Sequence, residues 1–232
     1  MIQRAFDLYR LGTKITRPGV LRTPEQVLTA TVRILREHRV PFLIHGAWAL
    51  AAYGFARATD DFKLEPGFVS LFNGKDLTGW CYAATDAAPA DKFDGKTESS
   101  DSRYSAANGA LVVHPLTPRK LAKIWTVQEF AKDFVLRLEF RATYNADSGI
   151  FVRGPQLQCR DYLVAGPYKE LKKYRPQDWN EIEVVVKGGV AYCTCNGEVL
   201  NAEMKVPATG AIGLEGDRGM MEYRRIRIKE LP

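Results

Sequence analysis

The sequence predicts a mainly β protein, a sandwich or barrel of antiparallel strands that carries a small N-terminal helical appendage. From residue 67 onward, glycines and prolines separate short runs in which apolar and polar residues alternate, as in strands with one buried face. Before that point, apolar residues recur at helical spacing. The chain of 232 residues, 46% of them hydrophobic, is long enough for one sandwich domain and a smaller appendage.

The N-terminal part, residues 1–64, is interpreted as a short α/β segment. An amphipathic helix is expected over 23–38, because a threonine cap and a proline precede apolar residues at helical spacing. A short buried strand is expected over 39–45 and a second helix over 47–53. The change of character at residues 65–67 marks the domain boundary.

The second part, residues 67–232, contains the predicted strands. Residues 134–141 alternate cleanly, with large apolar side chains on one face and charged side chains on the other. Residues 182–187 and 190–195 are predicted to form a hairpin around a Gly-Gly turn. The remaining expected features are a turn at Asn196-Gly197, strands over 211–215 and 221–228, and a long loop over 85–105.

The charge distribution argues against a nucleic-acid partner. The formal charge is +6 and the pI is near 9.1, but the basic residues are scattered and most lie beside acidic ones. The densest basic cluster is Arg224, Arg225, Arg227 and Lys229, and it is interpreted as the solvent-exposed face of the last strand. No nucleic-acid binding is therefore expected.

The four cysteines are expected to be buried free thiols. Cys81, Cys159, Cys193 and Cys195 form no C-x-x-C pair, and the three histidines lie far from them in the sequence. Neither arrangement matches the ligand spacing of a zinc site. A small apolar role in the core is the simpler interpretation.

No targeting or membrane segment is recognised. The N-terminus is interrupted by charges and lacks the apolar core of a secretory signal. The longest apolar stretch, residues 40–55, contains His45 and two glycines and is too short and too polar to span a bilayer. As it stands, the sequence predicts a cytoplasmic protein with no membrane partner.

The segment over 23–64 resembles the start of a minimal nucleotidyltransferase domain, with the matching motif at residues 45–63. The family places a Gly-Gly or Gly-Ser pair at a helix start and two carboxylates one residue apart on a strand, where they share metal ions. Here Gly46 is followed by Ala47, Asp61 matches the first carboxylate, and Lys63 occupies the second position. A lysine there repels a metal ion. The resemblance thus implies an inactive, truncated fragment, and no nucleotide cofactor is expected.

Residues 67–232 resemble the bacterial 3-keto-disaccharide hydrolase family. The resemblance implies a concanavalin A-like jelly roll of two curved antiparallel sheets, and a carbohydrate substrate oxidised at C3 of the sugar. Family members are frequently exported, which conflicts with the cytoplasmic prediction. The matching motifs, in family order, are GFVSLFNGKDLTGW at 67–80, FVLRLEFR at 134–141, NADSGIFVRG at 145–154, DWNE at 178–181, NG at 196–197, GAIGLE at 210–215 and RIRIKEL at 225–231.

Such a substrate needs a base for the C2 proton, a proton donor for the leaving oxygen and a cation near the C3 oxygen. If the sheet curves as the resemblance implies, Glu139, Arg153, Gln158 and Glu215 share its concave face. Glu215 or Glu139 is predicted to be the acid/base, and Arg153 to stabilise the enediolate. Whether a divalent metal ion assists is left open. The predicted substrate contacts are Gln158, Asp161, Asp217, Arg218, Trp179 and His114.

Structural interpretations compete with these roles. The charged residues equally fit an Arg–Glu ladder across strands, and Trp179 fits a core position. Asp147-Ser148-Gly149 is interpreted as a tight turn in preference to a ligand-binding loop, and Trp80 is interpreted as a core residue. Two other functions stay open for the whole domain: a non-catalytic carbohydrate-binding module, or a sandwich with an interaction role.

Overall fold

The computed structural model describes residues 63–85, 89–116, 121–164, 166–168 and 170–232. The chain divides between Lys63 and Leu64, and the second unit holds all the described strands. The helices and strand expected before residue 54, and Asp61, lie outside the described residues. In the described part of the chain, no helix has the length and apolar character needed to cross a membrane.

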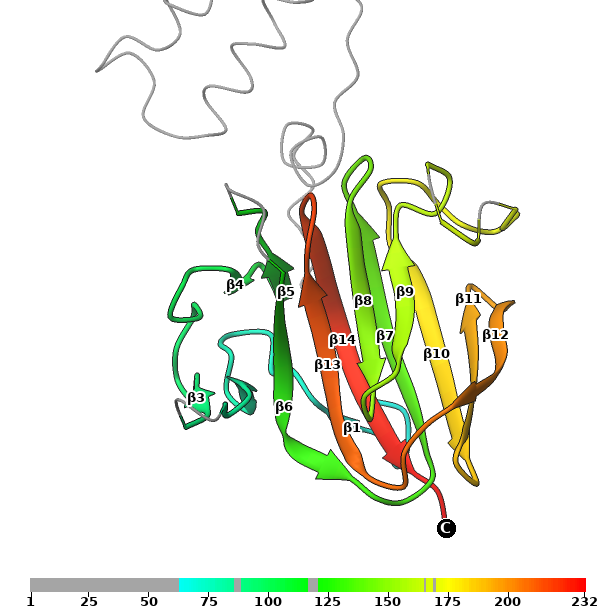
Figure 1. Ribbon diagram of the computed structural model, residues 1–232, viewed down its shortest axis with the longest axis horizontal. Helices are drawn as coiled ribbons and strands as arrows, with labels where there is room; N and C mark the ends of the chain where they lie inside the picture. Colours follow the sequence, from blue (N-terminus) through cyan, green and yellow to red (C-terminus); the bar gives the residue numbers. More distant parts are fainter. Residues whose placement is uncertain (1–62, 86–88, 117–120, 165, 169) are drawn as a thin grey trace, which may run out of the picture. The chain divides into compact units, whose positions relative to one another are not determined.

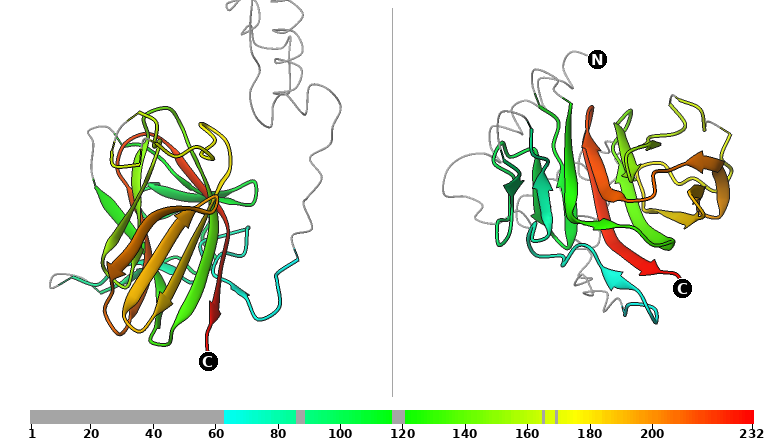
Figure 2. Two further views of the ribbon diagram at one scale, coloured as in Figure 1. Left: turned by 90° about the vertical axis from the view of Figure 1, so that its right-hand side faces the viewer. Right: turned by 60° about the horizontal axis from the view of Figure 1, so that its bottom comes forward.

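The described domain is the expected concanavalin A-like jelly roll, in which two antiparallel sheets pack face to face (Figures 1 and 2). Sheet A has the order β12 (Glu198–Lys205), β11 (Val190–Cys195), β10 (Asn180–Lys187), β7 (Phe134–Ala142), β14 (Met221–Glu230), β5 (Ala110–Val113) and β4 (Tyr104–Ala107), with β1 (Val69–Ser70) paired to β14. Sheet B has the order β3 (Asp91–Lys92), β2 (Trp80–Tyr82), β6 (Ala122–Phe130), β13 (Gly210–Gly216), β8 (Asp147–Val152) and β9 (Gln156–Arg160). Figure 1 looks onto sheet B, with sheet A behind it.

The core lies between the sheets and follows from strand alternation. On β7, every second residue from Phe134 to Phe140 has no exposed surface, and the residues between them face solvent. Leu214 and Ile150 meet this face from sheet B, also fully buried. Burial of each such side chain stabilises the fold by roughly 1.5–3 kcal/mol. Trp80 and the four cysteines are buried, as predicted, and the cysteines are free thiols.

The predicted hairpin is confirmed. Strands β10 and β11 pair in antiparallel register, with Lys187 opposite Val190 at the turn. Gly188 and Gly189 have φ angles of 57° and 77°, the left-handed values that a tight hairpin turn of this type requires. The second predicted turn, at Asn196-Gly197, adopts the same pair of positive φ angles.

The prediction of a single loop over 85–105 is wrong in part. Lys92 pairs with Cys81, so that a short strand, β3, closes the edge of sheet B. Tyr104 and Ser105 already belong to β4. The alternation of apolar and polar residues did not reveal β3 and the start of β4, because only two residues of each strand lie within 85–105.

The last strand contains a β-bulge that the sequence pattern did not reveal. Strict alternation from Tyr223 would place Arg225 in the core. Arg225 instead has a φ of 52°, and the register with β7 shifts between Arg224 and Arg227. The shift turns Ile226 and Ile228 inward and leaves the arginines on the outer face of sheet A.

Candidate functional site

The outer face of sheet B carries Glu215 and Gln158, two of the predicted site residues, together with further polar side chains. We call this solvent-facing side of β6, β13, β8 and β9 the site face. The alternation of each strand decides which residues reach it. On β13, Leu214 points into the core and Glu215 points outward. On β9, Leu157 and Cys159 are buried, so Gln156 and Gln158 point outward.

Glu215 is the central carboxylate of the site face. It lies opposite Lys123 of β6 in the strand register, and one carboxylate oxygen, Oε2, accepts a hydrogen bond from Gln156 Nε2 at 2.8 Å. Its residue is only 9% exposed. Burial raises the pKa of Glu215, and the negative charges of Asp217 and Asp147 act in the same direction, whereas Lys123 and Gln156 lower it. A carboxyl group with a raised pKa is a stronger base once it is ionised.

A second carboxylate, Asp147, lies on the neighbouring strand. Its Oδ1 accepts a hydrogen bond from Gln158 Nε2 at 2.6 Å, and its Oδ2 lies 3.5 Å from Arg160 Nη1 and 3.5 Å from Arg218 Nη2. Arg218 also donates to the backbone and side-chain oxygens of Asn145. These donors hold the Asp147 carboxylate in one orientation.

Two glycines keep the middle of the site face flat. A Cβ atom on Gly213 would lie 2.6 Å from Trp125 Cε3, so the indole ring rests directly on the β13 backbone. A Cβ on Gly149 would lie 2.1 Å from Gln156 Nε2, so the amide that reaches Glu215 crosses that glycine. The aromatic surface continues to Phe151, whose ring centroid is 5.4 Å from that of Trp125.

Of the predicted site residues, Glu215, Gln158 and Arg218 lie on or beside the site face, and Asp217 follows Glu215 on the same strand end. The backbone carbonyl of Asp217 accepts a hydrogen bond from Arg103 Nη2 at 2.9 Å. Arg103 is fully buried and also donates to the carbonyl of His114. Arg103 therefore fixes the strand end that carries both acidic residues.

The expectation that Glu139 shares this face is wrong. Glu139 belongs to β7 of sheet A and points away from the core, so the whole sandwich separates it from Glu215. Its carboxylate bridges Arg224 Nε at 2.7 Å and Arg225 Nη1 at 2.6 Å. Further pairs extend this arrangement as the Arg–Glu ladder that was the alternative interpretation, among them Arg137–Glu183 and Arg141–Glu222.

The expectation for Arg153 is also wrong, because one residue breaks the alternation. Arg153 has a φ of 54°, which turns its side chain away from the site face. The guanidinium group is buried above the Phe134 ring at 5.1 Å and donates to the carbonyls of Pro207 and Lys132. It ties loops together at one end of the sandwich and provides no cation next to Glu215.

Three other predicted residues have structural partners away from the site face. Trp179 is not a core residue: it is partly exposed and lies between Arg141, at 4.8 Å, and Arg224, at 4.0 Å, on sheet A. Asp161 is buried, and its Oδ2 accepts from the backbone N–H of Asn145 at 3.0 Å. His114 Nε2 lies 2.7 Å from the hydroxyl oxygen of Ser105 on β4.

The motif Asp147-Ser148-Gly149 is not a turn. It begins β8, and the turn before it is formed around Asn145, which has a φ of 56°. Because these residues are in a strand, Asp147 and Gly149 face outward while Ser148 faces the core. The Ser148 hydroxyl donates to the carbonyl of Glu215 at 2.6 Å and so links β8 to β13 below the site.

Sequence reasoning missed Lys123, Trp125 and Gln156. A signal for each was present. Lys123 and Trp125 alternate with the buried Ile124 in a run of nine strand residues. Gln156 has the same parity as Gln158, which was recognised.

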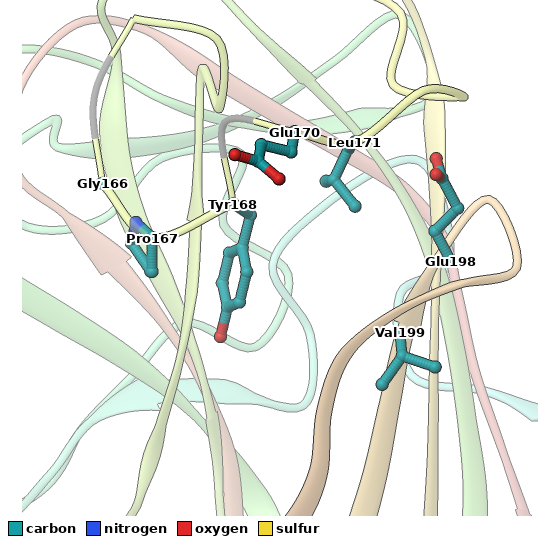
Figure 3. A pocket seen from close by; sticks show the side chains of 7 residues that line it. All are labelled: Gly166, Pro167, Tyr168, Glu170, Leu171, Glu198 and Val199. Atoms are coloured by element: carbon teal, nitrogen blue, oxygen red, sulfur yellow. The ribbon is translucent and has the colours of Figure 1, made fainter.

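An open depression of about 650 Å³ lies between β12, at the edge of sheet A, and residues 166–171 (Figure 3). Its lining is largely apolar, with Tyr168, Leu171 and Val199 turned toward the space. The carboxylate of Glu198 already accepts hydrogen bonds from the backbone N–H groups of Lys172 and Lys173. Among the described residues, no group of three or more His, Cys, Asp or Glu side chains is arranged to hold a metal ion.

The described domain is thus a jelly-roll sandwich whose outer sheet B face combines carboxylates, amides and an aromatic ring. Residues 67–229 match the model of the 3-keto-alpha-glucoside-1,2-lyase-like domain, and the chain belongs to this family. Membership supports a carbohydrate-related function and a carbohydrate ligand. No curated protein matches the sequence.

One solved structure shows the same fold, and a second has a lower similarity. A protein of Parabacteroides distasonis ATCC 8503 described as a glycosyl hydrolase has a TM-score of 0.55 and 18% identity, over 72% of this chain and 94% of that chain. The carbohydrate-binding module CBM66 from Bacillus subtilis has a TM-score of 0.47 and 8% identity, over 67% of this chain and 98% of that chain.

Proposed function

We propose that this protein cleaves 3-keto-glycosides on the site face, with Glu215 as the base that removes the C2 proton. The observation that carries the proposal is the environment of Glu215. Its carboxylate has a raised pKa, an amide donor in Gln156 and a cation in Lys123 directly across the strand pair. The family description, a 3-keto-alpha-glucoside-1,2-lyase-like domain, supports this choice of substrate and reaction.

The first step forms an enediolate. The C3 ketone acidifies the hydrogen on C2, and the Glu215 carboxylate takes that hydrogen as a proton. The C–H electron pair becomes the C2=C3 double bond, and the carbonyl electrons move onto the C3 oxygen. Lys123 lies opposite Glu215 in the strand register, and its positive charge lowers the pKa of Glu215. It is therefore the candidate cation for this negative charge, the role that was first assigned to Arg153.

The second step breaks the glycosidic bond. The enediolate electrons restore the C3 ketone and form a C1=C2 double bond, while the C1–O bond breaks and the leaving oxygen takes a proton. The proton on Glu215 is available for this transfer. Water then adds to C1, and a proton returns to C2. The net reaction consumes one water molecule and yields a 3-keto sugar and the free alcohol.

A non-catalytic carbohydrate-binding module is the second candidate. The observation that favours it is the composition of the face itself: Trp125, Gln156 and Gln158 offer an aromatic surface and amide groups, which are sufficient to bind a sugar without reacting with it. Under this alternative, a sugar binds to the same face and no bond is broken.

The two candidates are separated with p-nitrophenyl 3-keto-α-glucoside, from which cleavage releases a coloured product. Glu215→Gln keeps the shape of the side chain and removes the base, so we expect turnover to fall at least about a hundredfold. The matched control is Glu139→Gln, the same change on the opposite sheet, which should leave turnover unchanged. The unoxidised glucoside should not react, because its C2 hydrogen is not acidified. If the wild-type protein binds the keto-glucoside and releases nothing, it is a binding module.

A further inference from the structure

Trp125 occupies a position on the site face that neither the core nor the proton transfer explains. The indole is partly exposed, although it lies in the middle of β6 between two strands of sheet B. Its ring covers Gly213, with Cε3 and Cζ3 at 2.6 and 2.7 Å from the position that a Cβ would take. One face of the ring therefore packs on the β13 backbone, and the side chain as a whole stays partly exposed to solvent.

The ring is held in place before any ligand arrives. Phe151, only 5% exposed, contacts it at a centroid distance of 5.4 Å with an interplanar angle of 58°. The ammonium group of Lys123 lies 4.2 Å from the Phe151 ring centroid and so adds a cation–π contact to Phe151. An aromatic face that is fixed and left in water is typical of a site that stacks on a flat apolar surface, such as the C–H face of a sugar ring.

The distance between Trp125 and Glu215 indicates which ring would be bound there. Gly213 and Glu215 are two residues apart on β13, and a strand advances about 3.3 Å per residue, so the two positions are roughly 7 Å apart. Removal of the C2 proton requires the C–H bond to stand perpendicular to the ketone plane, so the reacting ring must present one of its faces to Glu215. A ring in that position does not also cover Trp125.

We propose that Trp125 stacks against the second sugar ring, the one attached to C1 of the reacting 3-keto sugar. The assignment of the reacting ring to Glu215 rests on the proposed function. The leaving group that the site selects is then itself a pyranose. Without it, the indole face would stay in water and its contribution to binding would be lost.

The test compares two substrates that differ only in the second ring, 3-keto-maltose and methyl 3-keto-α-glucoside. Trp125→Ala should lower kcat/KM for the keto-disaccharide roughly tenfold, the order of an aromatic stacking contact, and leave the methyl glycoside unchanged. Trp125→Phe keeps a smaller ring and should restore part of the difference. The matched control is Trp179→Ala, which removes a tryptophan from the opposite sheet and should affect neither substrate.

Equal losses for both substrates would overturn the proposal, because the ring on Trp125 would then be the reacting one, and so would no loss for either. A direct binding measurement separates this proposal from the proposed function. Unoxidised maltose and methyl α-glucoside cannot react, so their affinities for the wild-type protein and for Trp125→Ala are independent of catalysis. A wild-type preference for maltose that Trp125→Ala abolishes supports the subsite even if no keto-glycoside is cleaved. No such preference overturns it.

Discussion

The reaction proposed for the site face depends on single residues, and the surroundings of each residue set its pKa or its exposure. Glu215 illustrates this, since burial raises its pKa while Lys123 and Gln156 oppose the shift. The same strand places Gly213 two positions earlier, where the missing side chain admits the indole of Trp125. A carboxylate on β13 and an aromatic ring on the neighbouring strand β6 thus share the site face. The ring depends on the small Gly213 beneath it, and the carboxylate on the oppositely charged Lys123.

The pH dependence of cleavage should report the ionisation of Glu215. A protonated Glu215 cannot accept the C2 proton, so kcat/KM should rise with pH and reach half its plateau above pH 4.5, the ordinary value for a glutamate. Lys123→Met removes a cation that lowers this pKa, so the midpoint should move to higher pH. Asp217→Asn removes an anion that raises it, so the midpoint should move to lower pH. Shifts in the opposite directions would show that another group is the base.

Single residues also limited what could be predicted from the sequence. The faces of β7 were assigned correctly because its alternation from Phe134 to Phe140 is unbroken. At Arg225 one left-handed residue reverses the parity of the rest of β14. At Arg153, directly after the end of β8, it turns a single side chain away from the predicted face. Neither position is glycine or asparagine, the residues that usually signal such a conformation, so the sequence gives no local warning.

At the scale of the element, alternation defines the two faces of a strand but not the sheet to which the strand belongs. Glu139 and Glu215 were both correctly predicted to point outward, yet they point outward from different sheets. Sheet membership depends on pairings between strands far apart in the sequence, such as β7 with β10 and β14. The jelly-roll fold came from the resemblance of several separated motifs, whereas the arrangement of the site required the pairing itself.

The ladder on sheet A is expected to stabilise the fold and to have no part in the reaction. Glu139→Ala removes the carboxylate that joins Arg224 and Arg225 across the β7–β14 pair. Because all three side chains are partly exposed, we expect a loss of only about 1 kcal/mol in the free energy of unfolding. This corresponds to a fall in Tm of roughly 2–4 °C for a domain of this size.

Thermal unfolding and keto-glycoside cleavage, measured on the same preparation, check this prediction. Glu183→Ala serves as the comparison, because its carboxylate pairs with one arginine, Arg137, and should cost less. A loss of turnover in Glu139→Ala that exceeds the loss of folded protein would return Glu139 to the catalytic group.

At the scale of the whole molecule, Glu65 links the segment before β1 to the central strands of sheet A. Glu65 precedes the first strand, and its two carboxylate oxygens accept hydrogen bonds from Nε and Nη2 of Arg227, both at 2.8 Å. Arg137 Nη1 lies 3.4 Å from the same carboxylate. The Arg227 guanidinium is almost fully buried, so this pairing is shielded from solvent more than the rest of the ladder. Glu65 lies before the first matching motif, which begins at Gly67, yet its ion pairs make it part of the sandwich domain.

The Glu65–Arg227 pair should make the stability of the domain sensitive to acid. The hydrogen bond from Arg227 lowers the pKa of Glu65 from 4.5 to about 2. Because the folded-state pKa is below the unfolded one, the stabilisation is fully present above about pH 4.5 and is lost as the pH falls toward 2. The free energy of unfolding, measured in urea between pH 7 and pH 2, should therefore decline less steeply for Glu65→Gln than for the wild type. Glu203→Gln, which changes an exposed carboxylate on β12, is the control and should follow the wild-type curve. Parallel curves for Glu65→Gln and the wild type would mean that the Glu65–Arg227 contact does not persist in solution, and that the sandwich holds its first residues by the β1–β14 pairing alone.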